Sequence, residues 1–145
     1  MPQNQGQPDL QASPAQIAAI LKNYRVVAVV GLSADPSRPS YQVAQYLQQH
    51  GYRIVPVNPG QTEILGEKCY PSLKDIPFPV EVVDIFRQKE AVPAIVSEAL
   101  KKGVKVIWMQ LGLIAEEPAR RARAAGLEVV MDRCLKIEHG RHLGG

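Results

Sequence analysis

Short apolar runs alternate with helical patterns along most of the chain. Each run is rich in Val and Ile and is apolar at successive positions, which is typical of strands buried on both faces of a parallel sheet. The five runs are Val26–Leu32, Arg53–Asn58, Val80–Phe86, Val104–Leu111 and Leu127–Asp132. They predict a parallel sheet of five strands.

Helical patterns fill three of the intervals between these runs. The segments Tyr41–His50, Pro93–Lys102 and about Glu116–Ala125 predict helices, and a glycine suited to end a helix follows each of them. The interval Pro59–Pro79 is rich in proline and glycine, and it predicts a loop with one short helix near Ser72–Ile76.

A further helix precedes the first strand. Ser13 is a good N-cap and Pro14 fits the first helical position. Ile17 and Ile20 then recur at helical spacing. The preceding residues, 1–12, are rich in Gln and Pro with almost nothing to bury, and they predict a flexible N-terminal arm.

The order of these elements predicts an α/β fold with a single domain. Strands joined by helices form right-handed crossovers, and five such strands give a Rossmann-like, doubly wound parallel sheet. We expect the strand order 3-2-1-4-5. The domain spans residues 13–139, and residues 140–145 are expected to form a flexible tail. A chain of 145 residues is long enough to bury the core of one such domain.

Composition and charge argue against several function classes. Hydrophobic residues make up 46% and charged residues 21%, which is an ordinary globular composition. The 17 Lys and Arg against 14 Asp and Glu give a net charge of +3, too small by itself for the basic stripe of a nucleic-acid binder. No apolar run reaches the ~18 residues of a membrane span. Cys69 and Cys134 form neither a disulfide framework nor a zinc motif, which fits a protein of the cytoplasm.

The loop after the first strand is the most informative candidate for ligand binding. An open parallel sheet binds ligands beyond the carboxyl ends of its strands, where the strand order reverses, here expected after the first and fourth strands. Gly31 permits a tight turn, Arg38 is a phosphate donor, and Ser40 is expected to cap the next helix, whose N-terminus would bind phosphate. Alternatively, Gly31 is only a turn glycine and Arg38 only a solvated charge.

Two other strand ends carry candidate binding residues. Phe86 and Arg87 end the third strand, and an aromatic ring beside an arginine suits a base next to a phosphate. Alternatively, Phe86 closes the core and Arg87 faces solvent. At the end of the fourth strand Gln110 can hydrogen-bond an amide-containing ligand, while Met109 and Leu111 are more often core residues.

The pattern of a dinucleotide site is incomplete. Of the glycines in G-x-G-x-x-G only Gly31 is present, and Asn58 stands where an acid would hold the ribose. The sequence also lacks the phosphate-binding loop GxxxxGK[ST]. NAD is therefore disfavoured as a ligand.

Several ordered motifs together carry a family resemblance. They are VVAVVGLSADPSRPSYQVAQYL, YRIVPVNP, LGEKCYPSL, VEVVDIFRQKEAVP, VIWMQLG and VVMDRCLKIEH. In this combination the chain resembles the coenzyme A-binding domain family, most closely its small stand-alone bacterial and archaeal members (YccU-like). It is also similar to the N-terminal domain of the succinyl-CoA synthetase α subunit. The resemblance implies CoA or an acyl-CoA as ligand.

The resemblance also implies a set of binding residues. The first loop would hold the phosphates, the second-strand loop would line the site, and the later strand ends would meet the adenosine end and border the nucleotide. These residues are Gly31, Leu32, Ser33, Arg38, Ser40, Asn58, Pro59, Phe86, Arg87, Met109, Gln110 and Leu111. Where the synthetases have a lysine after the second strand this chain has Gln61, so Arg38 or Lys68 is expected to replace that contact.

No catalytic residue or metal site is predicted. Cys134 follows the fifth strand, where a thiol with a lowered pKa could exchange with CoA, but a small buried apolar residue is the simpler interpretation. His139 and His142, with Glu138 beside them, have a spacing that could ligate a metal. At a glycine-flanked terminus a solvated tail is the expected alternative.

The sequence therefore leads to two hypotheses. The first is a non-catalytic binding or regulatory module for CoA or an acyl-CoA. The alternative is an enzyme, either an NAD(P)-linked oxidoreductase or a catalyst of CoA-thiol/disulfide exchange that uses Cys134. The chain ends before any domain like the one that carries the synthetases' phosphorylated histidine, so ligase chemistry is not expected. A protein partner and a homodimer both stay open.

Overall fold

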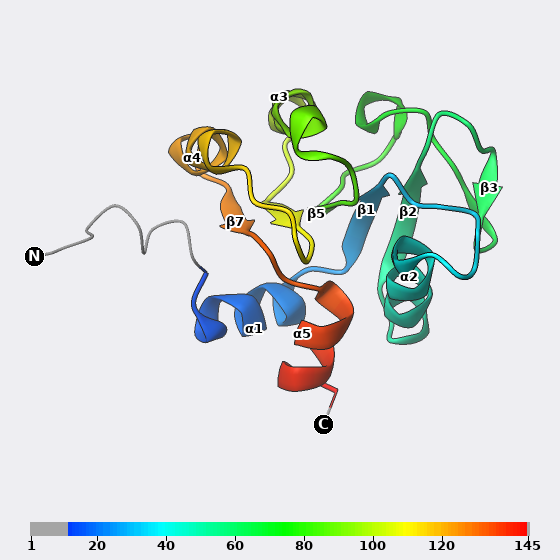
Figure 1. Cartoon of the computed structure of the whole chain (residues 1–145), viewed down its shortest axis with the longest axis horizontal. Helices are drawn as coiled ribbons and strands as arrows, with labels where there is room; N and C mark the ends of the chain where they lie inside the picture. Colours follow the sequence, from blue (N-terminus) through cyan, green and yellow to red (C-terminus); the bar gives the residue numbers. More distant parts are fainter. Residues whose placement is uncertain (1–11, 145) are drawn as a thin grey trace, which may run out of the picture.

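A five-stranded parallel sheet with helices on both faces forms the body of the protein (Figure 1). The computed structural model describes residues 12–144. The five strands are β1 (Val26–Val30), β2 (Arg53–Val57), β5 (Val82–Ile85), β6 (Val106–Met109) and β7 (Glu128–Val130). This arrangement confirms the predicted α/β, Rossmann-like class. The predicted N-terminal arm, 1–12, lies outside the described residues except for Ala12.

The strand order differs from the expected one. The sheet runs β2-β1-β5-β6-β7, which in chain order of its strands is 2-1-3-4-5, so the expected order 3-2-1-4-5 is wrong. Pro56 of β2 gives the physical reason, because proline lacks an N–H group and is confined to sheet edges. The Pro56 carbonyl accepts a hydrogen bond from the N–H of Tyr70 (3.0 Å), on the side away from β1. A sheet strand paired on that outer side would need the donor that Pro56 lacks.

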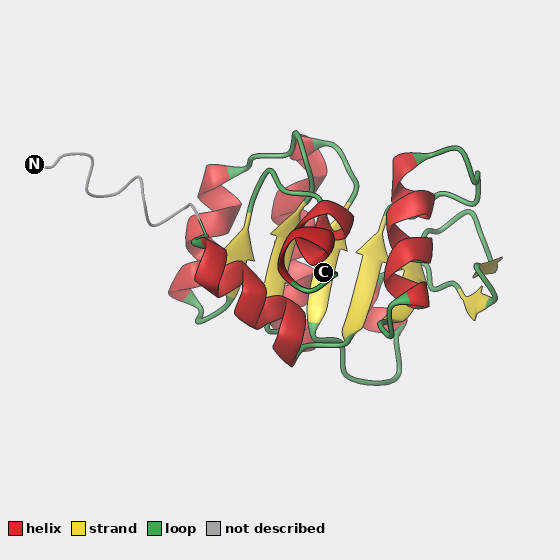
Figure 2. Ribbon diagram, turned by 90° about the horizontal axis from the view of Figure 1, so that it is seen from below, coloured by secondary structure: helices red, strands yellow, loops and turns green. Residues whose placement is uncertain are grey.

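Helices cover the two faces unequally (Figures 1 and 2). One face is packed by α1 (Pro14–Asn23), α2 (Pro39–Gln49) and α5 (Leu135–His142). The other is packed by α3 (Val92–Lys102) and α4 (Glu116–Ala124). The short elements are β3 (Glu63–Ile64), β4 (Glu67–Lys68) and the 3-10 helices η2 (Leu73–Asp75) and η3 (Lys89–Ala91).

The sequence pattern explains why both faces are apolar. Val27 and Val29 of β1 point to the α1/α2/α5 side, while Ala28 and Val30 point to the α3/α4 side, and all four are buried. Ser13 caps α1 as expected, since its hydroxyl accepts the N–H of Gln16 (3.1 Å). No helix among residues 12–144 is long and apolar enough to cross a membrane.

The C-terminal residues form a helix instead of a tail. The expected flexible segment begins at 140, but α5 extends to His142, and its Glu138 and His139 are buried. The Tyr46 hydroxyl and His139 Nδ1 are 2.9 Å apart, and Glu138 pairs with Arg141 (2.9 Å). The expectation of a solvated His139 is therefore wrong. The sequence pattern does not predict α5, because Gly140, a poor helix former, lies inside it.

His139 makes the stability of the fold sensitive to pH. Burial, and then the nearby His50 and Arg25, lower the pKa of His139 from its ordinary value of 6.5. The unfolded chain therefore binds this proton more readily, so the stabilisation is complete above about pH 6.5 and is lost as pH falls through the lowered folded pKa.

We expect His139→Gln to reduce the loss of stability between about pH 8 and about pH 5.5. Gln does not titrate but can still hydrogen-bond Tyr46. Urea unfolding of both proteins at the two pH values measures the effect. Glu63→Gln on the exposed β3–β4 hairpin is the control and should leave the native pH dependence of this interval in place. An identical pH dependence in the native protein and His139→Gln would contradict this assignment.

Candidate functional site

The candidate ligand crevice of this sheet lies between the carboxyl ends of β1 and β5. The strand order reverses there, because the chain goes from β1 to β2 on one side and continues from β5 to β6 on the other. The expected position, after the first and fourth strands, is corrected to the first and third. Backbone bonds fix the junction: Gly31 N–H donates to the Val57 carbonyl (2.9 Å) and Phe86 N–H donates to the Val30 carbonyl (2.8 Å).

Gly31 lets the two strand ends approach closely. Its φ is +90°, a conformation that residues with a Cβ rarely adopt. A Cβ at this position would lie 2.8 Å from the Cδ of Arg87 and closer still to the carbonyl oxygen of Phe86. The position therefore needs glycine for its turn and for the contact between the β1 and β5 loops.

Gly31→Ala should cost much more stability than Gly51→Ala. Both glycines have a φ of +90°, but nothing lies within 4 Å of a Cβ at Gly51. We expect Gly51→Ala to lower the free energy of unfolding by about 1–2 kcal/mol, from backbone strain alone. Gly31→Ala adds the clash with Phe86 and should cost roughly 3 kcal/mol or more. Urea denaturation measures both, and equal losses would show that the close approach is unimportant.

The loop after β1 is held by short side-chain bonds. The N–H of Ser33 donates to the Ser40 hydroxyl (2.9 Å), and the N–H of Asp35 donates to the Ser33 hydroxyl (3.0 Å). Helix α2 begins at Pro39 with Arg38 as its N-cap residue, so the expected capping role of Ser40 is wrong. Proline suits the first helical position and shifts the start towards the N-terminus. Ser40 instead is buried in the first turn and ties the loop to the helix.

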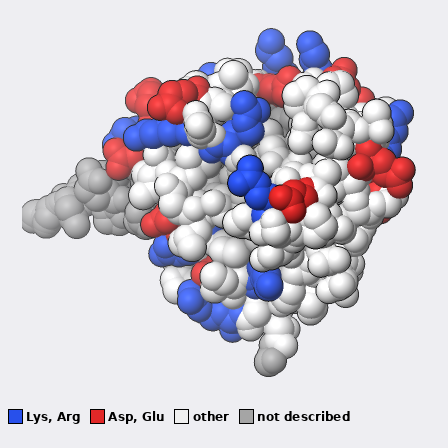
Figure 3. All heavy atoms as spheres, turned by 45° about the vertical axis from the view of Figure 1, so that its right-hand side comes forward, with Lys and Arg blue, Asp and Glu red and all other residues white. Residues whose placement is uncertain are grey.

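Charges of both signs lie around the crevice. Hydrogen bonds from the Ser37 N–H and hydroxyl, with a smaller effect of Arg38, lower the pKa of the Asp35 carboxyl. An acidic group therefore stands beside the exposed Arg38. Figure 3 shows basic and acidic side chains in small groups over one face of the molecule, with no continuous basic band across it. On this face, phosphate binding would depend on the local placement of charged side chains.

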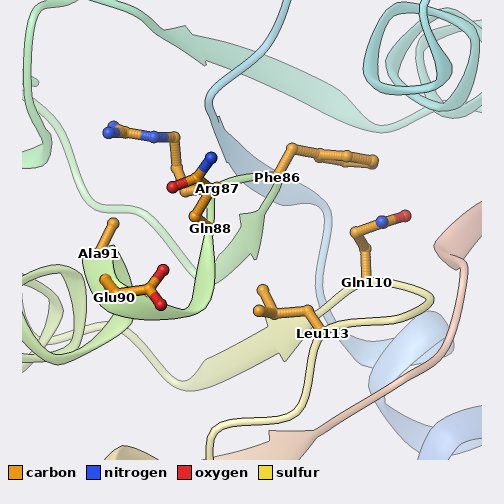
Figure 4. Close-up of a pocket in the computed structure, with 7 residues that line it drawn as sticks. All are labelled: Phe86, Arg87, Gln88, Glu90, Ala91, Gln110 and Leu113. Carbon is orange, nitrogen blue, oxygen red and sulfur yellow. The ribbon is translucent and has the colours of Figure 1, made fainter.

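Strand alternation divides the crevice into two halves. Phe86 and Gln110 project together to one side, whereas Arg87 projects to the other (Figure 4). A cavity of about 810 Å³ opens here. It is lined by Phe86, Arg87, Gln88, Glu90, Ala91, Gln110 and Leu113.

A second cavity, of about 460 Å³, lies at the ends of β1 and β2. Gly31, Asn58, Pro59 and Arg87 line it among others, so Arg87 borders both cavities. The Asn58 side chain also joins the two loops, since its Nδ2 donates to the Leu32 carbonyl (2.9 Å). The two cavities together thus bring residues from four of the expected loops, those after β1, β2, β5 and β6, to this edge of the sheet.

Some expected binding residues lie outside these two cavities, among them Ser33, Arg38 and Ser40 of the loop after β1 and the start of α2. Leu32 and Met109 are fully buried in the core, and Met109 packs on the α3/α4 side. Lys68 lies over the ring of Tyr70, 5.3 Å from Nζ to the ring centre. Leu111 is 56% exposed and lines a neighbouring hollow with Gly112 and Ile114. Leu32 and Met109 therefore support the crevice from the core and do not line its cavities.

The cavities also contain residues that sequence reasoning missed. Gln88 and Glu90 line the larger cavity, and Ser72 and Glu98 line the smaller one. The sequence alone marks Glu98 as unusual. It follows Ile95 by three positions on a predicted helix, so it places a charge on an otherwise apolar face.

Neither cysteine lines the two cavities. Both thiols are free. Cys69 is buried, and its desolvation raises the pKa of the thiol, although the bond to the Asn58 carbonyl (3.4 Å) opposes this. Cys134 is the N-cap residue of α5 and is partly buried against the α1/α2/α5 core.

Asp84 is an unusual group in the centre of the sheet. It pairs with Val29 and Trp108 in neighbouring strands and is fully buried. Its carboxyl oxygens have no hydrogen-bond partner among the described residues. Burial raises the pKa of Asp84 well above its ordinary value, because desolvation favours the uncharged form of the carboxyl.

Comparisons with known proteins agree on the family of this chain. Residues 25–140 match the CoA binding domain family. The uncharacterized protein YneT of Bacillus subtilis is 42% identical over 127 residues, which cover 88% of this chain and 94% of that protein. A solved hypothetical protein from Pyrococcus horikoshii OT3 superposes with a TM-score of 0.90 at 42% identity, covering 99% of this chain and 100% of that one.

Larger relatives contain a similar region. The α subunit of the ADP-forming acetate–CoA ligase II of Pyrococcus furiosus is 32% identical over 126 residues. The match covers 79% of this chain but only 28% of that subunit. The chain is thus similar to one part of a ligase subunit and to the whole of smaller proteins.

Proposed function

Because the chain belongs to the CoA-binding domain family, we propose that it binds coenzyme A or an acyl-CoA in the crevice between β1 and β5. The Gly31 junction is the observation that carries this proposal beyond the family match. It brings the β1 loop against Phe86 and Arg87, and these two residues line one cavity together with Gln110. A phosphate-binding loop beside an aromatic ring and an arginine suits a nucleotide with several phosphates.

The start of α2 supports phosphate binding. The first N–H groups of a helix have no partner within the helix, and the helix dipole favours an anion there. Arg38 is exposed at this end and makes no side-chain bond that caps α2. Its guanidinium is therefore free to pair with a diphosphate.

We further propose that the protein acts as a non-catalytic binding or regulatory module. The two thiols lie outside the cavities, so the crevice offers no nucleophilic sulfur as the structure stands. Ligase activity belongs to relatives of which this chain spans about a quarter or less, and it is not carried over.

Titration calorimetry with CoA, acetyl-CoA, ADP and NAD tests the ligand class. We expect CoA and acetyl-CoA to bind more tightly than NAD, because Asn58 stands at the end of the second strand, where an acid would hold the ribose diol of a dinucleotide. Absence of CoA binding at millimolar ligand would overturn the proposal. A stronger affinity for NAD would favour the oxidoreductase alternative instead.

Arg38→Gln should weaken CoA binding by roughly three- to ten-fold at low ionic strength, since one exposed phosphate pair is lost. The loss should shrink as salt is added, because salt screens an exposed pair. Arg120→Gln, on the exposed face of α4, is the matched control and should leave the affinity unchanged. A Kd for Arg38→Gln equal to that of the native protein in low salt would remove Arg38 from the site.

A further inference from the structure

A groove between η2 and α3 lies apart from the crevice. Its volume is about 550 Å³, which is in the range of small-molecule sites. It shares no lining residue with the larger cavity and only Glu98 with the smaller one. The residues that line this η2–α3 groove all belong to those two elements, and they are Lys74, Ala94, Ser97, Glu98, Lys101 and Lys102.

Two hydrogen bonds hold the walls of the groove together. At the start of η2 the N–H of Leu73 donates to Oε1 of Glu98 (3.1 Å). At its end the Nζ of Lys102 donates to the carbonyl of Ile76, the C-cap residue of η2. The groove is therefore shaped before any ligand enters it, and a preformed site loses less conformational entropy on binding.

Three lysines from two elements line the groove. Lys101 and Lys102 lie in the last turn of α3, where cations offset the helix dipole. The dipole does not account for Lys74, which comes from η2. Lys102 uses one of its three N–H donors on Ile76 and keeps the other two. Three like charges along one groove repel one another, and an anion bound among them removes that repulsion.

Ser97 adds a neutral donor to the groove. Its hydroxyl oxygen accepts an N–H of Arg121 (2.7 Å), so its own O–H is left to donate elsewhere. The second N–H group of Arg121 donates to the carbonyl of Pro93 (2.6 Å), which fixes this guanidinium beside α3. The groove therefore presents hydroxyl and ammonium donors together.

Acidic groups limit the positive charge of the groove without cancelling it. Glu98 is the one acid among the described lining residues, against three lysines. Asp75 follows Lys74 in the chain, but its carboxylate accepts the hydroxyl of Ser72 (2.7 Å) and does not line the groove. An anion in the groove thus meets more donors than acceptors.

The placement of the lysines determines the ligand chemistry. An anion with a single charged group can pair with the lysine of η2 or with those of α3, whereas a ligand with two or more such groups pairs with both walls. The ammonium of lysine is a point charge without a preferred plane, so carboxylates and phosphates both suit it.

We propose that the η2–α3 groove binds a small polyanion, an oligophosphate or a polycarboxylate. Lys74 pairs with one anionic group of the ligand, and Lys101 and Lys102 pair with another. Glu98 opposes the binding and keeps the affinity moderate. This site is separate from the CoA crevice and does not depend on the proposed function.

Calorimetry at low ionic strength and without CoA tests the ligand class. The probes are tripolyphosphate, citrate and, as the simple anion, sulfate. We expect tripolyphosphate or citrate to bind at least about five-fold more tightly than sulfate, and added salt to weaken the binding. The tighter of the two probes identifies the anionic group. No binding of either polyanion at millimolar concentration, or equal affinity for sulfate, would overturn the proposal.

Charge variants then test the lining residues. Lys74→Gln and Lys101→Gln should each weaken polyanion binding by about three- to ten-fold at low salt. Glu98→Gln should strengthen it by about two-fold or more, because a repulsive charge is removed while Gln still accepts the N–H of Leu73. Lys102 is left unchanged, since it also holds Ile76.

Matched controls separate the groove from the net charge of the protein. Lys22 lies in the last turn of α1 on the other face of the sheet, and Glu117 is exposed on α4. Lys22→Gln and Glu117→Gln should leave the affinity unchanged. If either control changes the affinity as much as the corresponding groove variant, the binding is a response to net charge and the site assignment is wrong.

NMR locates the bound polyanion independently of the variants. Titration of the ¹⁵N-labelled protein should shift the backbone amides of Leu73 and Ser97 and leave that of Gln110 in the crevice in place. Shifts confined to the crevice would overturn the proposal. Lys74 and Lys101 are exposed, so their variants should keep the native unfolding curve.

Discussion

The contact between Gly31 and the carbonyl of Phe86 is the constraint on which the crevice depends. A side chain at position 31 would occupy the space of the Phe86 carbonyl and the Arg87 stem, so the loops of β1 and β5 could not meet. That meeting places the ring of Phe86 and the side chain of Arg87 around one hollow, next to the loop that leads from β1 to α2. It also sends Arg87 to the α3 side and leaves Phe86 on the α2 side, because adjacent residues at a strand end point in opposite directions. One missing Cβ therefore sets the division of the site into two halves.

The electrostatic potential around the crevice depends on where the charged side chains lie and not on the net charge of the protein. A net charge of +3 is too small to attract a polyanion, yet Arg38 stands at the start of α2 and Arg87 lies against Gly31 at the exit of β5. Each has an acidic residue in its neighbourhood, Asp35 beside Arg38 and Glu98 across the smaller cavity from Arg87. Such mixed surroundings limit the affinity for simple anions, because an inorganic phosphate meets a carboxylate together with the arginine. A ligand that also presents an amino group or extended apolar surface avoids that penalty.

Local sequence patterns predicted the strands, most helices and the loops of the crevice, because apolar periodicity reports burial directly. They failed where tertiary context decides the outcome. The strand order depends on which strands pair with β1. In the sequence only Pro56 indicated that β2 is an edge strand, and it is a single residue within an apolar run. Helix α5 was missed because Gly140 breaks the pattern, and its burial depends on Tyr46 from a distant helix. Of the expected site residues, Met109 serves the core, because strand alternation points it away from the crevice.

A ligand stabilises a fold when it binds the folded state and not the unfolded chain. Arg87 is exposed and Glu98 is partly buried where both line the smaller cavity, so water still solvates the two charges. A ligand that binds only the folded state adds stability that grows with the logarithm of its concentration, about 2.7 kcal/mol at a hundred times its Kd. Glu98 already holds the N–H of Leu73, so occupation of the smaller cavity joins α3, η2 and the β5 exit through one bound molecule. Ligand binding in this fold is therefore expected to stiffen the α3 side of the sheet, the side on which the chain between β2 and β5 has the least regular structure.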